Sequence, residues 1–364
     1  IAEMAHQEMV ERYGKETAYT GGYKVFTTVT STLQHAAQQA VVNNIFAYDQ
    51  RHGYRGPITS LRPVDDKNSS VNAINQAAIS KEEISLALAS LDSYQTLMPA
   101  VVTEVSERSI KVALKDGADI TIDWQGLAWA RAHINDDKQA VPPSVASEIV
   151  KFGDVIIVAA TTDGYRLSQL PDVSSALVSL STDNGAIKAA VGGFSFEQSQ
   201  FNRVTQAKRQ VGSNIKPFIY SAALDSGYTL ASIVNDAPIN QWDRSSGVVW
   251  RPKNSPPVYN GEIRLRLALA QSKNVIAVRL LRDVGLDKII PYLASFGFDP
   301  DDLPRNESLA LGSASLTPLE VATGFATFAN GGFLIEPYLI ERIEDSFGNI
   351  IFQANPAIAC DNCE

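Results

Sequence analysis

The chain has 364 residues, of which 45% are hydrophobic and 20% are charged, and its formal net charge is −9. This length and composition are typical of a globular protein with two or three domains. The acidic balance argues against a phosphate-binding surface, so we expect no nucleic-acid partner. No stretch approaches the roughly 18 consecutive apolar residues of a membrane-spanning helix. No signal peptide opens the chain, so we expect any membrane anchor to belong only to a longer parent protein.

Residues 1–95 are expected to form a linker and the N-terminal part of a larger region. They open with a polar helical segment, and the β-branched and aromatic residues at 25–29 predict a short strand. A helix rich in glutamine and alanine is expected from residue 32 to about residue 48, and a polar connection is expected at 63–69.

Residues 96–170 are expected to form a small all-β module. Apolar and polar residues alternate there with the period of two that half-buried strands show. The size of the module and the spacing of its strands predict an OB-like β-barrel insert. Its candidate stacking aromatics, Trp124 and Trp129, are few and its surface is acidic, so we expect a protein contact or a spacer role. The expected strands are 101–105, 109–114, 119–124, 153–158 and 165–170.

Residues 171–364 are expected to combine helices with an antiparallel sheet. Asn184-Gly185 between two apolar segments is a hairpin-turn signal. Helical periodicity begins near Ser213, and strand patterns return at 333–337, 340–344 and 349–352.

The strongest candidate for chemistry is the pair formed by Ser213 and Lys216. Residues i and i+3 share a face of a helix, so the hydroxyl and the ammonium are expected to touch. Pro217 is tolerated this early in a helix, and Gly227 stands where a glycine would end it. The spacing of a packed helix is followed by the apolar residues Ile215, Phe218, Ile219, Ala222 and Ala223.

Ser213 and Lys216 fit a serine nucleophile with a lysine base. At a helix N-terminus the Ser213 backbone N–H can stabilise developing oxyanion charge. A lysine with an ordinary pKa of ~10.4 cannot accept a proton at neutral pH, but burial lowers that pKa by ~3 units or more. The alternative is that Ser213 is a helix N-cap and Lys216 a solvated first-turn residue, and the spacing alone favours that alternative.

A second candidate motif is Ser272-Lys273-Asn274, which lies between two apolar stretches. On a non-helical link the side chains of residues i and i+2 can enter one cleft. Ser272 could then relay a proton, and Asn274 could hold a substrate backbone. The alternative is an ordinary N-cap for the helix expected from residue 275 towards Gly285.

In this order the two motifs resemble those of the penicilloyl-serine transferases, the group of penicillin-binding proteins and serine β-lactamases. Over nearly the whole chain the sequence is similar to the class A bifunctional penicillin-binding proteins of type 1a. Residues 23–28 and 51–57 resemble their linker segment, and 191–213 resembles the approach to their nucleophile. Further similar blocks are 250–254, 259–261, 309–313 and 328–332.

The resemblance implies an α+β transpeptidase core like that of penicillin-binding proteins and serine β-lactamases. It also implies a D,D-transpeptidase that cross-links peptidoglycan stem peptides. In such an enzyme Lys216 takes the proton from Ser213, whose oxygen attacks the carbonyl between two terminal D-alanines. Ser272 passes the proton to the leaving amine, and Asn274 holds the substrate amide.

The same resemblance implies partners and a location. β-Lactams are expected to acylate the nucleophilic serine, and other envelope proteins are possible partners. The enzyme is expected at the periplasmic face of the bacterial inner membrane, without a cofactor.

The chain departs from the family pattern in two places. The family's Lys-Thr/Ser-Gly motif is absent, since Thr323-Gly324 is preceded by Ala322. We expect that strand, which supplies the second oxyanion donor, to lie beyond Glu364, so that the C-terminal strands are missing. Nothing here resembles the glycosyltransferase domain of class A members, so we expect that activity only for the parent protein.

Two other functions stay open at this point. A D-Ala-D-Ala carboxypeptidase or a β-lactamase-type hydrolase would need a water-activating base, which the sequence does not identify. A non-catalytic envelope scaffold with the same fold would not be acylated at all.

The cysteines and histidines give no metal site. Cys360 and Cys363 form a Cys-x-x-Cys pattern that we interpret as a structurally minor or disulfide-bonded pair. No second cysteine pair or group of histidines completes a set of metal ligands, so we expect no metal. The four histidines are scattered, which also argues against a Ser-His-Asp mechanism.

Overall fold

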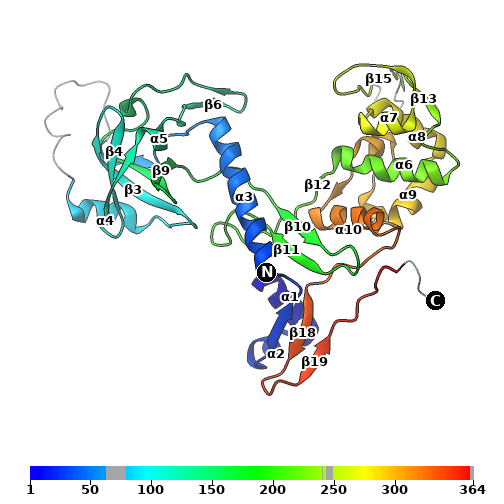
Figure 1. The fold of residues 1–364 in the computed structure, drawn as a ribbon, viewed down its shortest axis with the longest axis horizontal. Helices are drawn as coiled ribbons and strands as arrows, with labels where there is room; N and C mark the ends of the chain where they lie inside the picture. The colour runs from blue at the N-terminus through cyan, green and yellow to red at the C-terminus, as the bar shows by residue number, and fades with distance from the viewer. Residues whose placement is uncertain (63–78, 240, 243–248, 361–364) are drawn as a thin grey trace. The chain divides into compact units, whose positions relative to one another are not determined.

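The computed structural model describes residues 1–62, 79–239, 241–242 and 249–360 (Figure 1). The chain forms two compact units. Unit 1 consists of residues 1–38, 176–192 and 202–364, and unit 2 consists of residues 39–175 and 193–201. The polar connection expected at 63–69 lies outside the described residues.

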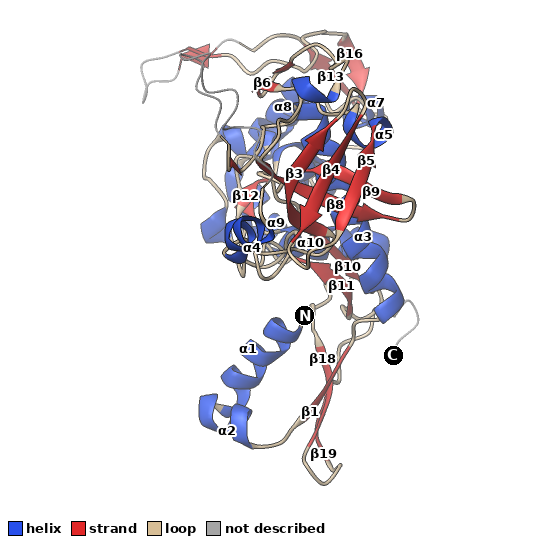
Figure 2. Ribbon diagram, turned by 90° about the vertical axis from the view of Figure 1, so that its left-hand side faces the viewer, coloured by secondary structure: helices blue, strands red, loops and turns tan. Residues whose placement is uncertain are grey.

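Unit 2 is built on one antiparallel sheet, whose central strands lie side by side in Figure 2. The strand order is β2-β8-β3-β4-β5, and β9 also pairs with β8. All of them except β2 overlap the strands predicted from the alternation of apolar and polar residues. The central strands β3 and β8 are buried over longer runs than alternation implies. Their bounds are β2 (Thr59–Ser60), β3 (Leu97–Val105), β4 (Ser109–Leu114), β5 (Asp119–Asp123), β8 (Asp154–Thr161) and β9 (Gly164–Ser168).

The sheet of unit 2 is open. No strand pairing within the described residues joins its two edges, so the OB-like module does not form the closed barrel that we predicted. α4 (Lys81–Ala89) covers part of one face with Ile84 and Leu88, and a capping box of Ser80 and Glu83 starts this helix. The smaller elements are α5 (Trp124–Leu127), β6 (His133–Asn135), β7 (Lys138–Gln139) and η1 (Ala146–Glu148).

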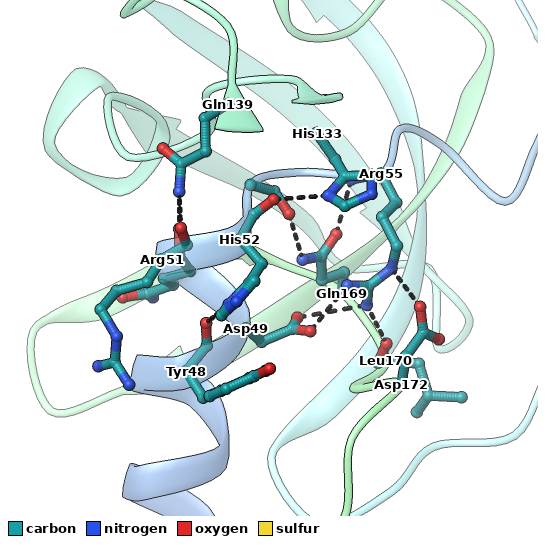
Figure 3. A network of polar contacts seen from close by, with 12 residues as sticks. Tyr48, Asp49, Arg51, His52, Arg55, His133, Gln139, Gln169, Leu170 and Asp172 are labelled. Atoms are coloured by element: carbon teal, nitrogen blue, oxygen red, sulfur yellow. Dashed lines mark hydrogen bonds and ion pairs between the residues drawn. The ribbon is translucent and has the colours of Figure 1, made fainter. Parts of the chain in front are cut away.

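The C-terminal end of α3 (Ser31–His52), which belongs to unit 2, is held by side chains of the same unit (Figure 3). His133 Nδ1 donates to His52 O at 2.7 Å, and Gln139 Nε2 donates to carbonyls of the same turn. The buried Asp49 forms an ion pair with Arg55 at 2.7 Å. The last carbonyls of a helix have no intrahelical partner, so these donors fix where α3 ends.

Unit 1 contains a three-stranded antiparallel sheet and a separate hairpin. The sheet has the order β1-β18-β19, and the hairpin pairs β10 with β11 around Asn184-Gly185, as predicted. Thr28 joins the two, because its hydroxyl donates to Ile187 O at 2.8 Å and its N–H to Leu339 O at 2.8 Å. The bounds are β1 (Lys24–Thr27), β10 (Leu177–Leu180), β11 (Ile187–Val191), β18 (Ile340–Glu344) and β19 (Ile350–Gln353).

The strand expected at 333–337 does not form, and that prediction is wrong. The segment follows Gly331 and Gly332, which both have positive φ, and it runs against the hairpin turn. Tyr338 N donates to Gly185 O at 3.2 Å. The backbone of this segment therefore makes contact with a turn instead of entering a ladder.

The rest of unit 1 is mainly helical, with six short strands among the described residues, and carries its largest apolar core. The principal helices are α1 (Ala2–Tyr13), α2 (Lys15–Thr20), α6 (Lys216–Asp225), α7 (Leu265–Ala270), α8 (Asn274–Val284), α9 (Leu286–Ala294) and α10 (Pro318–Ala329). Single 3₁₀ turns occur at η2 (Gly212–Ile215), η3 (Pro300–Asp302) and η4 (Glu307–Leu311). Short strands are β12 (Arg209–Gln210), β13 (Ile233–Asp236), β14 (Gln241–Trp242), β15 (Val249–Trp250), β16 (Gly261–Arg264) and β17 (Ser315–Leu316).

α6 is the central helix of this core, and its predicted apolar stripe is buried throughout. The ring of Phe218 lies within 5.1 Å, centroid to centroid, of the rings of Phe296, Phe298, Phe325 and Phe328. The helix ends at Asp225, and Gly227 follows with φ of 99°, as the sequence predicted. Of the helices in the described ranges, none combines the length and the apolarity needed to cross a bilayer.

Candidate active site

Ser213 lies in a 3₁₀ turn that runs directly into α6. Its side chain is exposed, whereas Lys216, one turn further on, is 1% exposed. Pro217 occupies the first turn of α6, where its missing N–H costs no hydrogen bond. The hydroxyl is thus presented at the surface by a helix that is itself fixed in the core.

A close backbone contact supports the Ser213 turn. Gly212 N donates to Gly312 O at 3.0 Å, and Val211 N donates to Ala314 O at 3.0 Å. Gly312 has φ of 78°, and a Cβ at this position would lie 1.9 Å from Gly212 O. Only glycine fits there, so the sequence block around Gly312 is needed to hold the turn.

Lys216 points towards the segment that contains Ser272 and Asn274. Its Nζ lies 2.6 Å from Ser272 O, 2.9 Å from Ser272 Oγ and 2.6 Å from Asn274 Oδ1. The two sequence motifs, separated by about sixty residues of chain, therefore meet at one amine.

The amine of Lys216 is electrostatically unusual. Burial lowers the pKa of Lys216 from 10.5 to about 8, because the charged form loses its hydration. No carboxylate of the described residues forms an ion pair with this Nζ to offset that loss. A substantial fraction of the amine is therefore neutral near physiological pH.

Ser272 stands between the lysine and the candidate nucleophile. Ser272 Oγ is 3.1 Å from Ser213 Oγ and 2.9 Å from Lys216 Nζ. The direct contact between Ser213 and Lys216 that we expected is absent from the hydrogen bonds of the described residues. The acceptors Ser272 O and Asn274 Oδ1 bind Lys216 Nζ instead, so the amine contacts Ser213 only through Ser272.

Asn274 is held at both ends of its amide. Its Oδ1 accepts from Lys216, and its Nδ2 donates to Lys253 O at 2.7 Å. The alternative interpretation, an ordinary side-chain N-cap from this motif, is not found, because the N-cap position of α8 is Lys273 and its side chain makes no capping hydrogen bond. Asn254 caps this helix from another segment, because its Oδ1 accepts from Asn274 N at 2.9 Å and from Val275 N at 3.2 Å.

The sequence predicts no role for Lys273, Asp236 and Asn254, which lie next to the segment of Ser272 and Asn274. Lys273 is buried and forms an ion pair with Asp236 at 2.9 Å, and Asp236 also binds Asn254 at 2.7 Å. The block 250–254, which resembles the family, contains Asn254. The burial of Lys273 could have been predicted from the alternation of side chains in Ser272-Lys273-Asn274. This alternation directs the middle side chain away from its two neighbours.

The described residues contain no group of three or more histidine, cysteine, aspartate or glutamate side chains placed to hold a metal ion. Cys360 is disulfide-bonded, in agreement with one of the two interpretations of the Cys-x-x-Cys pattern, and Cys363 lies outside the described residues. The groups gathered around Lys216 are hydroxyls, amides and an amine, a set suited to proton transfer and covalent catalysis.

Two family models match the chain. Residues 54–173 match the penicillin-binding protein OB-like domain, and residues 175–359 match the penicillin binding protein transpeptidase domain. The chain belongs to the penicillin-binding protein transpeptidase family. The predicted resemblance and the predicted α+β fold class are thereby confirmed.

The similar proteins carry one name. The chain is 52% identical to penicillin-binding protein 1A of Vibrio cholerae and 48% identical to that of Escherichia coli. These alignments cover 99% and 100% of the chain but 43% and 42% of the relatives, so the chain spans less than half of their length. A crystal structure of penicillin-binding protein 1A from Haemophilus influenzae matches with a TM-score of 0.83 at 46% identity, over 99% of this chain and 50% of that one.

Replacement of Gly312 by alanine tests the support of the Ser213 turn in this penicillin-binding protein. The new Cβ would overlap Gly212 O and also force a non-glycine residue into a left-handed conformation. We expect Gly312→Ala to lower the free energy of unfolding by about 2–4 kcal/mol, measured by urea denaturation.

Gly227→Ala is the matched control for that change. Gly227 also has positive φ, 99°, but a Cβ there would meet open space. The control isolates the backbone cost, about 1–2 kcal/mol. Equal losses in the two variants would contradict the close approach of Gly312 to Gly212.

Proposed function

We propose that this chain is the acyl-transfer part of a serine D,D-transpeptidase, in which Ser213 is the nucleophile, Lys216 the base and Ser272 the proton relay. The observation that carries the proposal is the continuous chain of contacts from Ser213 Oγ through Ser272 Oγ to the buried Lys216 Nζ. Membership in the transpeptidase family supports the reaction class.

The partners of Lys216 determine where its proton can come from. Ser272 O and Asn274 Oδ1 can only accept hydrogen bonds, so a neutral amine gives them its two N–H groups. Its lone pair is then left for the third partner, the Ser272 hydroxyl, which can donate. In the structure Lys216 Nζ donates to Ser272 Oγ, and Ser272 Oγ donates to Ser213 Oγ at 3.1 Å. When the amine is neutral, the Ser272 hydroxyl turns to donate to Lys216, and its oxygen then accepts the proton of Ser213.

This arrangement supports a complete acylation step. Ser213 Oγ forms a bond to the substrate carbonyl carbon while its proton passes to Ser272, and the Ser272 proton passes to Lys216. The carbon–nitrogen bond then breaks, and the proton returns along the same chain to the leaving nitrogen. The Ser213 backbone N–H, at the start of the helical turn, is our candidate for one oxyanion donor.

The substrate proposed for this step is the D-Ala-D-Ala end of a peptidoglycan stem peptide, and the amine of a second stem peptide resolves the acyl-enzyme. Asn274 is proposed to bind the substrate amide with the N–H that Lys253 O does not occupy. β-Lactams are proposed to acylate the same serine.

For the whole protein we propose a peptidoglycan glycosyltransferase as a second activity, a place at the periplasmic face of the bacterial inner membrane, and envelope proteins as partners. The proposal follows from the resemblance to class A members and from the similarity to proteins named penicillin-binding protein 1A. Residues 96–170 are proposed to act as an OB-like spacer or protein contact, and residues 171–364 to carry the transpeptidase chemistry.

Labelling with a β-lactam tests the nucleophile. Incubation of the protein at its natural length with benzylpenicillin is expected to add one penicilloyl group at Ser213, seen by intact mass and mapped by peptide mass spectrometry. Ser213→Ala is expected to abolish the adduct, because among the hydrogen bonds of the described residues Ser213 supplies the only second hydroxyl that contacts Ser272 Oγ. Ser226→Ala, an exposed serine at the end of the same helix, serves as the control and keeps full labelling. An adduct on any other residue would refute the assignment.

The pH dependence of acylation tests the base. Only neutral Lys216 can accept a proton, and its pKa is about 8. The acylation rate constant is therefore expected to rise about tenfold per pH unit below this value and to level off above it. Stopped-flow measurement with a chromogenic cephalosporin between pH 6 and pH 10 gives the profile. A rate that is already constant at pH 6 would mean that Lys216 is not the base.

A further inference from the structure

The segment that carries Ser272 rests on a buried polar cluster. Lys273 is 6% exposed, and its side chain points away from the relay. Its Nζ lies 2.9 Å from Asp236 Oδ2, 2.9 Å from Val258 O and 3.0 Å from Asn260 Oδ1. All three donors of the ammonium are thus used.

Asp236 connects this ammonium to the start of α8. It is fully buried at the end of β13, and its other oxygen accepts from Asn254 Nδ2 at 2.7 Å. Asn260 N also donates to Asp236, at 3.0 Å. Burial alone would raise the pKa of Asp236, but the bonds from Asn254, Lys273 and Asn260 hold it below its ordinary value. Asp236 is therefore a buried carboxylate that needs its partners.

The cluster binds the three residues that directly follow Ser272. Lys273 is the next residue along the chain, and Asn254 holds the backbone N–H groups of Asn274 and Val275. Ser272 itself has φ of 51°, a left-handed conformation that costs a non-glycine residue energy. Such a conformation persists only where the surroundings determine it, and the bonds of Lys273 and Asn254 supply that constraint.

Stability alone is a weak reason for this cluster. A buried ion pair gains little net free energy over apolar residues of similar volume, because both charges lose their hydration. The cluster instead determines the orientation of the backbone segment that it binds, because hydrogen bonds are directional. What it fixes is the segment whose hydroxyl must lie near both Lys216 and Ser213.

We propose that Lys273 and Asp236 form a positioning pair that holds Ser272 in its left-handed conformation, so that its hydroxyl bridges Lys216 and Ser213. This inference rests on the proposed function. Neither residue touches the reacting atoms. Loss of the pair lets the Ser272 backbone relax, which breaks the relay without removing any member of it.

The test uses the double variant Asp236→Asn/Lys273→Met in the protein at its natural length. Both charges are removed together, so no buried charge is left unpaired and no net charge is added near Lys216. We expect the plateau acylation rate at high pH to fall about 100-fold, as for a catalytic group displaced by about an ångström. Non-covalent binding of the β-lactam is expected to stay unchanged. The midpoint of the pH profile is expected to move above that of the wild type, because water reaches Lys216.

Arg282→Met/Glu307→Gln is the matched control. This pair also joins α8 to another segment, with an N–O distance of 2.6 Å, and it is partly buried. We expect the control to lower thermal stability but to keep the acylation rate and the pH midpoint of the wild type.

The outcomes separate the two proposals. If the wild type is not acylated at Ser213, the proposed function fails. If the wild type is acylated and the folded double variant behaves like the control, only the positioning role is overturned. Should the double variant not fold, Asp236→Asn alone is measured, since Lys273 then keeps its bonds to Val258 and Asn260. A several-fold loss of plateau rate is expected for it, and a rate equal to that of the control contradicts the inference.

Discussion

The burial of the Lys216 amine away from water determines how the other groups of the site are arranged. The amine of Lys216 is useful as a base only if it is partly neutral, and burial is what lowers its pKa to about 8. The hydrogen-bond partners of Lys216 Nζ are suited to a neutral amine. Two are obligatory acceptors and the third is a hydroxyl, so the neutral amine can direct its lone pair only at Ser272.

This burial lowers the stability of the fold. The pKa of Lys216 is lower in the folded chain, about 8, than its ordinary value of 10.5, so the unfolded chain binds the extra proton between these values. Stability attributable to this group therefore rises with pH across that window and is lowest below pH 8. The difference corresponds to about 3 kcal/mol at neutral pH. The aromatic cluster around Phe218 and the apolar stripe of α6 offset this cost within the same helix.

Much of the framework could be predicted from local patterns. The stripe from Ile215 to Ala223, the stop at Gly227 and the strands of unit 2 follow from periodicity and from glycine, which act over a few residues. The strand expected at 333–337 does not form because its backbone runs against the turn at Gly185, far away in the sequence.

In the site, too, local patterns identified the residues but not the contacts between distant segments. The sequence supplied Ser213, Lys216, Ser272 and Asn274, and the structure brings all four together. The sequence could not predict that Lys216 contacts Ser272 and not Ser213, because the acceptors that bind the lysine side chain come together only in the folded chain. The cap that Asn254 gives to α8 and the pair of Lys273 with Asp236 were hidden for the same reason. Each joins segments that no short-range pattern connects.

The most direct measurement of the central claim is an NMR titration of Lys216 itself, with ¹³C-labelled lysine and the Lys216→Arg variant to assign the signal. The Cε shift of Lys216 should titrate with a midpoint near 8, well below that of the other lysines. A midpoint near 10.5 would show that the amine stays charged in its pocket, and the proton relay described here would then have no base.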